Sequence, residues 1–324
     1  MSNHDVTKLA GESLPAVDAD RLIADLRLLV EVADATPLVC GPFLGEIGYE
    51  TLYWIPFLAR MLEAGALRRR KLVIMSRGGT EALYRCVPEC RDAQYVDVID
   101  VLGDERFLEL ERRRLVEPRA KNQKASSAVE SAILAEAGLA QAVQLLPAHM
   151  FRLLRRYPVE TLLSFPWRAP DAERENLTVV KFWFGGQFPA TNENLEFIRR
   201  LLDELVSAGP VTALDNDFTL ELNPEVDEPF RAICRDAGVT VATTTSYRTN
   251  LAEQIGVLFR AKRLVSTYGG FCYLGLYTGI EIESYYTNPR IVFTSHLQTF
   301  AHALACLNAK TDAGPAIPFS LIQA

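Results

Sequence analysis

The 324-residue sequence has no hydrophobic run long enough to cross a membrane and no excess of positive charge. A spanning helix needs roughly 20 consecutive apolar residues, and no segment approaches that length. The opening segment, MSNHDVTKLAGESLP, is polar and shows no secretory signal peptide. The formal net charge of −7 argues against nonspecific binding to nucleic acid or to an anionic membrane. We therefore expect neither a membrane span nor a nucleic-acid partner.

The sequence also lacks the cysteine spacing that is typical of a metal site. Most of its six cysteines lie in apolar runs, as small core residues do. Cys86 and Cys90 form the one close pair, and no second ligand pair accompanies them, whereas structural zinc needs four ligands. We expect no metal. With no signal peptide in view, a reducing cytoplasm is the default compartment.

What the sequence does contain is an alternation of short apolar runs with amphipathic helical patterns. Hydrophobic residues make up 49% and charged residues 23%, which is an ordinary globular composition. Candidate strands in the first half are TPLVCGP and residues 71–76, 94–101 and 143–147, and residues 46–66 have helical spacing. A segment with three prolines, 157–175, precedes a second series of five strands alternating with helices.

This alternation is typical of parallel sheets covered by helices on both faces. We predict an α/β protein with two Rossmann-like domains, 1–160 and 161–324, that face each other across a cleft. The last helix is a candidate to pack back on the N-terminal domain. Ligands of open α/β sheets bind outside the carboxyl ends of the strands, so we expect the functional residues in the segments that follow each strand.

The segment after the first strand, GPFLGEIGYE, carries glycines and two carboxylates. Gly45 and Gly48 let the backbone approach a ligand, and the helix that follows attracts anions at its start. Glu46 is predicted to project into the cleft as a general base or a substrate anchor. The alternative is that Glu46 and Glu50 both stabilise the helix dipole, and for Glu50 we favour this alternative.

The second strand argues against a dinucleotide cofactor. The glycine spacing after the first strand does not match GxGxxG, and no acidic residue ends KLVIMS to bind a ribose. We therefore do not expect NAD. Arg77 follows this strand and precedes two glycines. Its guanidinium group either binds a phosphate or carboxylate through two hydrogen bonds or is a surface group in a turn.

Three strand ends of the second half carry candidate ligand-binding groups. Lys181 lies inside an apolar strand, where a lysine either snorkels to the surface or marks the ligand site. Asp215 and Asn216 end the next strand, placed to touch a ribose or a base edge. In STYGGFCYLGLYTGI, which starts at residue 266, a polar, glycine-paired loop opens a predicted helix over 271–277. Its backbone N–H groups suit a diphosphate, and the alternative is an ordinary N-capped helix with a glycine turn.

These motifs resemble those of a known enzyme family. STYGGFCYLGLYTGI looks like the loop and helix with which GT-B glycosyltransferases hold the diphosphate of a nucleotide sugar, as in heptosyltransferase-like and fucosyltransferase-like enzymes. GPFLGEIGYETLYWIPFL resembles the N-terminal loop and helix of bacterial polysaccharide-cluster glycosyltransferases, and LLPAHMFRLL and KFWFGGQFPATNEN fit the same pattern. The similarity touches most of residues 39–300. The paired-glutamate motif of several retaining enzymes is missing, because Glu281 and Glu283 do not copy its spacing, so the stereochemistry stays open.

The resemblance implies transfer of a sugar from a nucleotide-diphosphate sugar to a hydroxyl acceptor in a metal-independent GT-B fold. It implies Glu46 as the catalytic base, with His149 as the second choice and a helix-cap role as the alternative for that histidine. The implied donor-binding residues are Lys181, Asp215, Asn216, Ser266, Thr267, Tyr268, Gly269 and Gly270. The implied acceptor or phosphate contacts are Gly45, Gly48 and Arg77. Two alternatives remain: a nucleotide-sugar epimerase of the same architecture, and a non-catalytic nucleotide- or sugar-binding subunit.

Overall fold

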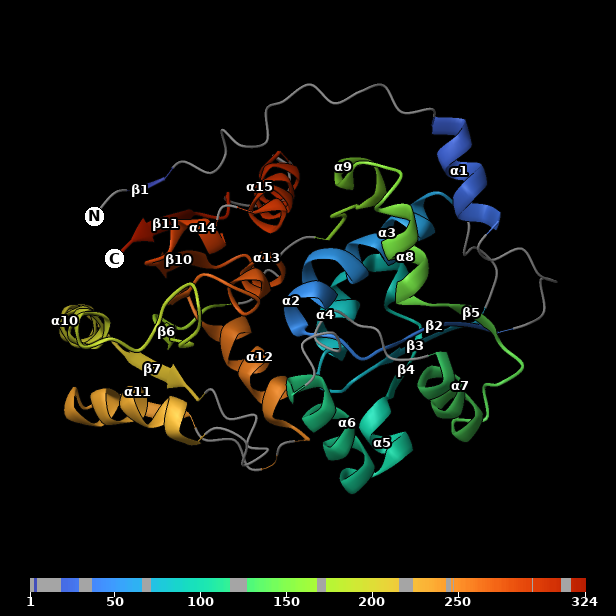
Figure 1. Cartoon of the computed structure of the whole chain (residues 1–324). Coiled ribbons are helices and arrows are strands. Elements are labelled where there is room, and N and C mark those ends of the chain that lie inside the picture. Colours follow the sequence, from blue (N-terminus) through green and yellow to red (C-terminus); the bar gives the residue numbers. More distant parts are fainter. Residues whose placement is uncertain are drawn as a thin grey trace. The chain divides into compact units, whose positions relative to one another are not determined.

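The computed structural model describes most of the chain as two compact units, each built around one β-sheet (Figure 1). Its described residues are 3–4, 19–28, 37–65, 71–116, 127–167, 173–215, 224–242, 246, 248–292, 294–309 and 316–324. We call Glu12–Trp167 the N-terminal unit, and Arg168–Ala324 together with Met1–Gly11 the C-terminal unit. No described helix is both long and apolar enough to cross a bilayer.

The N-terminal unit contains a four-stranded parallel sheet with the order β4-β3-β2-β5. Its strands are β2 (Leu38–Phe43), β3 (Leu72–Ser76), β4 (Gln94–Asp97) and β5 (Val143–Leu145). Its helices are α1 (Ala19–Leu28), α2 (Ile47–Tyr49), α3 (Ile55–Glu63), α4 (Glu81–Cys86), α5 (Val98–Leu102), α6 (Asp104–Val116), α7 (Ser127–Glu136), α8 (Pro147–Leu153) and α9 (Val159–Leu162), with a π-helix at Glu50–Trp54 and a 3₁₀ turn at Pro88–Cys90. When the four strands are numbered by their position in the chain, their spatial order is 3-2-1-4, as in the first four strands of a Rossmann sheet.

Close packing of β2 on β3 depends on Gly41. This residue has φ +119°, and a β-carbon there would lie 2.1 Å from the carbonyl oxygen of Met75. The pairing register shifts at this point, between Cys40 and Phe43. Every residue of β2 is buried, as expected for a central strand of a parallel sheet covered on both faces.

Two sequence predictions need correction in this unit. The predicted strand 94–101 is wrong beyond Asp97, because Val98–Leu102 form α5. The neighbouring strand β3 ends at Ser76, which pairs with Asp97, so the β-branched residues that follow have no strand to pair with. The helical stretch predicted over 46–66 is present, but it contains the π-helix Glu50–Trp54 between α2 and α3.

The C-terminal unit contains a seven-stranded sheet with the order β1-β11-β10-β9-β6-β7-β8. Its strands are β6 (Thr178–Lys181), β7 (Val211–Leu214), β8 (Thr240–Ala242), β9 (Arg263–Thr267), β10 (Glu281–Tyr286), β11 (Phe319–Gln323) and the antiparallel β1 (Asn3–His4). Its helices are α10 (Asn192–Ala208), α11 (Pro224–Asp236), α12 (Asn250–Arg260), α13 (Gly275–Thr278), α14 (Pro289–Val292) and α15 (Ser295–Asn308), with a 3₁₀ turn at Cys272–Leu274. The parallel strands from β8 to β11 follow the Rossmann order 3-2-1-4-5-6.

Aromatic side chains fill the core of this unit. The rings of Phe182, Phe188, Phe197 and Tyr285 pack with centroid separations of 5.0–6.3 Å. The helix that covers them, α10, is capped at its N-terminus by Thr191, whose Oγ1 accepts a hydrogen bond from the amide of Asn194. Figure 1 shows α10 and α11 side by side next to β7.

The helix predicted over 271–277 is shorter and less regular than expected. It consists of a 3₁₀ turn and the single α-turn of α13. Gly275 packs directly on β10, since a β-carbon there would lie 2.4 Å from Cδ1 of Ile282. Gly279 then ends the helix in the left-handed region, with φ 66°.

Both sheets therefore confirm the prediction of two Rossmann-like α/β folds. The boundary between the two units lies at Trp167 and Arg168, whereas the sequence-based division placed it at residues 160 and 161. The cleft between the domains stays a prediction.

Candidate functional site

The switch point of the C-terminal sheet lies between β6 and β9. Among the parallel strands of this sheet, β6 comes first and β9 fourth along the chain, yet they are neighbours in space, with Lys181 opposite Ser266. Ligands of Rossmann sheets bind at the carboxyl ends of the strands where the strand order reverses. Lys181 is the last residue of β6 and Thr267 the last of β9, so the structure brings these two predicted donor residues together at that point.

The ammonium group of Lys181 connects three elements. Its Nζ donates to the carbonyl oxygen of Asp215 at 2.5 Å and to Oε1 of Gln254 at 2.9 Å. It also lies 4.6 Å from the centroid of the Phe271 ring, within cation–π range. The side chain is half-buried. Its positive charge is therefore held at the switch point, next to the segment that follows β9.

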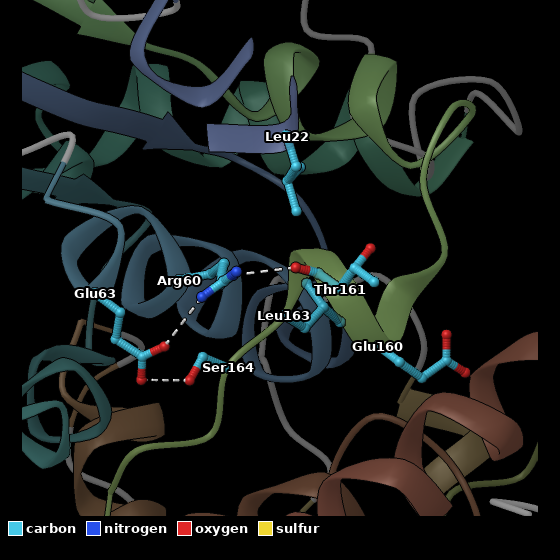
Figure 2. A pocket seen from close by; sticks show the side chains of 7 residues that line it. All are labelled: Leu22, Arg60, Glu63, Glu160, Thr161, Leu163 and Ser164. Atoms are coloured by element: carbon cyan, nitrogen blue, oxygen red, sulfur yellow. Dashed lines mark hydrogen bonds and ion pairs between the residues drawn. The ribbon is translucent and has the colours of Figure 1, made fainter. Parts of the chain in front are cut away.

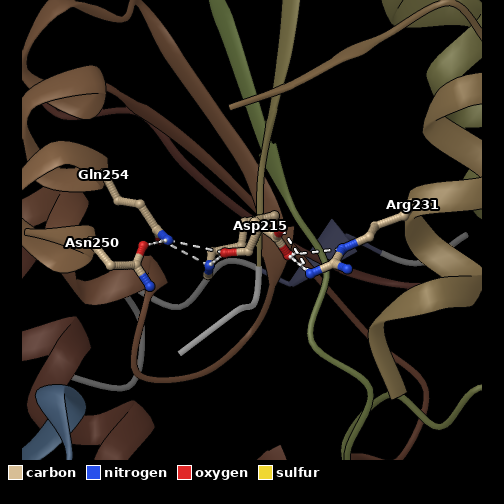
Figure 3. A network of polar contacts seen from close by, with 5 residues as sticks. Asp215, Arg231, Asn250 and Gln254 are labelled. Carbon is tan, nitrogen blue, oxygen red and sulfur yellow. Dashed lines mark hydrogen bonds and ion pairs between the residues drawn. The ribbon is translucent and has the colours of Figure 1, made fainter. Parts of the chain in front are cut away.

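Asp215 is enclosed in a polar network (Figure 3). Its carboxylate forms an ion pair with Arg231 of α11, with 2.8 Å between Oδ2 and Nη2. On the other side Nε2 of Gln254 donates to the Asp215 carbonyl at 3.0 Å and to Oδ1 of Asn250 at 2.6 Å. The predicted nucleoside contact of Asp215 stays a prediction, and Asn216 lies outside the described residues.

The sequence did not predict Arg231, Asn250 or Gln254 as part of this network. Asn250 and Gln254 are buried together with Leu251 and Ile255 on α12. Two amides four positions apart among the apolar residues of one helix are the signal that indicates a buried polar network.

Most of the predicted diphosphate loop is engaged within the fold. Ser266 is fully buried, and Oγ1 of Thr267 accepts a hydrogen bond from the Trp183 amide at 3.1 Å. The amide of Tyr268 donates to the carbonyl of Tyr285 at 2.9 Å, and its hydroxyl lies 3.2 Å from that of Tyr273. The side chains of Ser266 and Thr267 are therefore buried rather than facing solvent, and that of Thr267 binds the Trp183 amide.

The next three residues, Gly269, Gly270 and Phe271, are half-buried. The Gly269 carbonyl accepts from the Cys272 amide at 3.1 Å, which turns the chain into the 3₁₀ segment. Within the described part of the chain, the amides of Gly270 and Phe271 make no hydrogen bond. Backbone N–H groups in such a position can donate hydrogen bonds to an anion.

The N-terminal sheet has a switch point of its own, between β2 and β5, where Cys40 pairs with Leu145. Glu46 follows β2 as the N-cap of α2, with extended backbone angles, and is half-buried. His149 follows β5 in the first turn of α8. The rings of Tyr49 and Phe151 meet edge to face at 6.3 Å, which brings α2 against α8. The two catalytic candidates therefore lie on neighbouring elements of one unit.

The geometry of His149 gives it a capping contact. Its Nδ1 accepts the backbone N–H of Leu146 at 3.2 Å, so the neutral ring carries its proton on Nε2. Burial, and secondly the nearby Arg152, lower the pKa of His149. This histidine is thus neutral near pH 7 and presents a donor at Nε2.

Arg77 is buried beneath the loop that carries Glu46, so the reading as a surface turn residue is wrong. Its Nη2 lies 2.5 Å from Oε2 of Glu111, and both side chains are almost fully enclosed. Its Nη1 also lies 3.4 Å from the carbonyl of Gly45. The role of Arg77 toward a phosphate, and those of Gly45 and Gly48, stay predictions.

Glu50 lies in the first turn of the π-helix and is bound by a cluster of hydroxyl groups, while its role at the helix dipole stays a prediction. It is 0% exposed, and its Oε1 accepts hydrogen bonds from the hydroxyls of Ser76, Thr80 at 3.1 Å and Tyr84 at 2.7 Å. Burial raises the pKa of Glu50, and the hydrogen bonds from Ser76 and Tyr84 oppose that rise. This carboxyl group ties the π-helix to the segment after β3.

A separate cavity of about 380 Å³ lies in the N-terminal unit (Figure 2). Nε of Arg60 donates to the Thr161 carbonyl at 3.1 Å, and Oγ of Ser164 donates to Glu63 at 2.6 Å. None of the predicted site residues that the structure describes lines it. The lining residues are Leu22, Arg60, Glu63, Glu160, Thr161, Leu163 and Ser164. Among the described residues, no group of three His, Cys, Asp or Glu side chains could hold a metal.

Comparison with known proteins gives distant structural likenesses. No protein-family model matches the chain, and no curated protein sequence matches it. The chain is similar to the crystal structure of a glycosyl transferase of family 9 from Veillonella parvula, at 13% identity and a TM-score of 0.48, covering 90% of this chain and 88% of that one.

Two further solved structures are also glycosyltransferases. The ADP-heptose lipopolysaccharide heptosyltransferase II of E. coli is 13% identical, with a TM-score of 0.47 over 81% of this chain and 88% of that one. The dodecameric, iron-containing glycosyltransferase TibC of enterotoxigenic E. coli is 12% identical, with a TM-score of 0.41 over 78% of this chain and 58% of that one. The strand orders of the two units, rather than these likenesses, establish the fold of this chain.

Proposed function

We propose that this protein is a glycosyltransferase that moves a sugar from a nucleotide-diphosphate sugar to a hydroxyl acceptor. The observation that carries the proposal is the meeting of Lys181 with the segment Gly269–Phe271 at the switch point of a Rossmann sheet. A held ammonium group beside backbone amides suits a diphosphate, whose charge grows as it leaves the sugar.

The donor roles follow from this placement. Lys181 and the amides of Gly270 and Phe271 contact the diphosphate, with Tyr268 and Thr267 fixing the loop from beneath. The nucleoside extends toward the end of β7, at Asp215 and Asn216. We infer that this positive site neutralises the leaving group without a divalent ion, so EDTA is expected to leave the rate unchanged.

The acceptor roles fall to the N-terminal domain. Glu46 is half-buried at the carboxyl end of β2, beside Gly45 and Gly48, where a carboxylate can take a proton from an acceptor hydroxyl. His149 offers an N–H donor at Nε2 rather than a free basic nitrogen, so it suits orientation of the acceptor. Arg77, paired with Glu111, supports the loop that carries Glu46.

A thermal-shift panel of UDP, GDP, ADP, CDP and TDP tests the donor site. We expect at least one of them to raise the unfolding temperature, because a ligand that binds only the folded state stabilises it. Lys181→Met and Gly270→Val are expected to abolish the shift. Gly256→Ala, on the described part of α12 with open space around it, is the matched control that keeps the shift. Absence of any shift in the wild type would refute the donor site.

Turnover is tested separately by mass spectrometry of the products. Transfer adds the mass of one sugar to the acceptor, whereas epimerisation leaves the donor mass unchanged. Glu46→Gln keeps the shape of the side chain but cannot act as a base, so we expect nucleotide binding to persist and transfer to fall by about 10²–10⁴-fold. Full activity in Glu46→Gln would remove that residue from the mechanism.

A further inference from the structure

The loop after β6 presents an exposed aromatic ring. Trp183 is 45% exposed, whereas its neighbours Phe182 and Phe184 are buried in the core. Its backbone is fixed, because its amide donates to Oγ1 of Thr267. A large aromatic side chain held at a strand end in solvent contact is a platform on which a ligand can pack.

Two glycines allow close packing of the side chains around this ring. A β-carbon at Gly185 would lie 3.3 Å from Cδ1 and Nε1 of Trp183, and one at Gly186 would lie 2.8 Å from Cδ1 of Ile291. Neither glycine has a backbone conformation that other residues avoid. Their lack of a side chain therefore lets Trp183 pack close to Gly185 and Ile291 pack close to Gly186. The side chain of Ile291 is 47% exposed.

The amide of Gln187 lies between the two glycine loops of the site. Its Oε1 would be 3.3 Å from a β-carbon at Gly185, and its Nε2 would be 3.4 Å from one at Gly269. The backbone of Gln187 is bound to the segment after β10, which lies on the other side of β9 from β6. The Gln187 carbonyl accepts a hydrogen bond from the amide of Thr287 at 2.8 Å. Gln187 thus reaches from β10 toward the proposed diphosphate loop.

The strand order gives the direction of a ligand along this edge. Asp215 follows β7, Lys181 ends β6, Gly269 follows β9 and Thr287 follows β10, and these four strands are consecutive neighbours in the sheet. A donor whose diphosphate lies at Lys181 and Gly269, and whose nucleoside lies at β7, has its sugar on the β10 side. Gln187 is bonded to Thr287 on that side, and Trp183 is bonded to Thr267 at the end of β9, next to it.

We propose that Trp183 and Gln187 form the sugar subsite of the donor, an inference that rests on the proposed function. A sugar ring has an apolar C–H face and a rim of hydroxyl groups. The indole ring can pack against that face, and one amide can both donate to and accept from the hydroxyls. Trp183 and Gln187 would thus determine which sugar is accepted, since a site that hydrogen-bonds a substrate hydroxyl discriminates strongly against analogues without it.

The test compares affinities for a nucleoside diphosphate and for its sugar conjugate by titration calorimetry. The probes are UDP and UDP-glucose, GDP and GDP-mannose, ADP and ADP-glucose, and TDP and TDP-glucose, and the tightest pair is used. For Trp183→Ala and Gln187→Ala we expect the conjugate to bind about tenfold more weakly and the diphosphate alone to bind as in the wild type. Trp183→Phe keeps a ring and is expected to retain most of the affinity. Val206→Ala, an exposed apolar residue on α10, is the control.

Each other outcome overturns the subsite. Equal weakening of the diphosphate and its conjugate would place the nucleoside, not the sugar, on Trp183. No weakening of either would remove both residues from the donor site while leaving the proposed function intact. Failure of the wild type to bind any of the diphosphates would refute the proposed donor site, and the subsite with it.

Discussion

The backbone amide of Trp183 donates a hydrogen bond to Oγ1 of Thr267, with 3.1 Å between the two atoms. This bond joins the loop after β6 to the last residue of β9, two segments that are 84 positions apart in the sequence. It fixes the relative position of the two loops that form the proposed donor site. The hydroxyl of Thr267 is therefore a part of the scaffold on which the donor contacts depend.

Thr267→Val tests this bond. The substitution keeps the branched shape but removes the acceptor, so we expect the free energy of unfolding to fall by about 0.5–1.5 kcal/mol. We also expect a smaller thermal shift with the nucleoside diphosphate. Thr267→Ser keeps an oxygen at the same atom and is the control. Urea unfolding measures the loss, and an equal loss in both variants would contradict the role given to the hydroxyl.

Glu50→Leu is expected to be severely destabilising. It leaves the buried hydroxyls of Ser76 and Tyr84 without their acceptor, so we expect a loss of about 2–4 kcal/mol in the free energy of unfolding. Glu50→Gln keeps an acceptor oxygen at Oε1 and is expected to lose less than half of that amount. Equilibrium unfolding in urea compares them, and similar losses in the two variants would show that packing rather than hydrogen bonding matters at this position.

Glu130 on α7 predicts a pH dependence of stability. It is 7% exposed, and burial raises its pKa from 4.5 to about 7. The folded state therefore binds this proton more tightly than the unfolded state, and the free energy of unfolding falls as the pH rises from 4.5 through about 7. Each pKa unit corresponds to about 1.4 kcal/mol, so the full shift sets an upper limit of about 3.5 kcal/mol.

Glu130→Gln should remove this dependence. We expect the variant to be more stable than the wild type by about 1–2 kcal/mol near pH 8 and to match it near pH 4. Urea unfolding at both pH values provides the measurement. Glu89→Gln, an exposed residue of the same unit, is the control and should follow the wild type. A benefit of Glu130→Gln that is equal at both pH values would rule out the titration as its cause.

Two glycines of the C-terminal unit predict opposite effects of the same substitution. Gly275→Ala would place a methyl group 2.4 Å from Cδ1 of Ile282, and we expect a loss of about 1–3 kcal/mol. Gly256→Ala lies within α12 with nothing within 4 Å of the new methyl group, and we expect a gain of about 0.5–1 kcal/mol from helix propensity. Thermal unfolding measures both, and changes of the same sign would contradict the packing assigned to Gly275.

The sequence alone was sufficient for the fold class and for the positions of most strands. Buried apolar runs such as β2 and β9, separated by helical patterns, predict parallel sheets because only a crossover can join parallel neighbours. The same reading failed at Val98 and Ile99, whose β-branched side chains favour a strand. The neighbouring strand β3 ends at Ser76, opposite Asp97, so Val98 and Ile99 have no strand to pair with. Strand pairing depends on residues distant in the sequence, which a local pattern does not include.

In the candidate site, too, some residues were predicted from the sequence and others were not. Glycines and polar residues after apolar strands marked Lys181, Gly269 and Gly270 from the sequence, since local backbone freedom and strand ends leave a local signal. Their neighbours were not predictable. Arg231 pairs with Asp215 across 16 positions, and Gln254 reaches Lys181 across 73.

The amino-acid sequence by itself determined that alternating strands and helices would form, and that flexible, polar segments would follow the strands. Only the tertiary structure decided which polar groups are engaged inside the fold, such as Thr267 and Glu50, and which remain half-exposed, such as Gly270. The physical reason is that periodicity and turn chemistry act between near neighbours, whereas burial and hydrogen bonding depend on side chains that the sheet order brings together from distant segments.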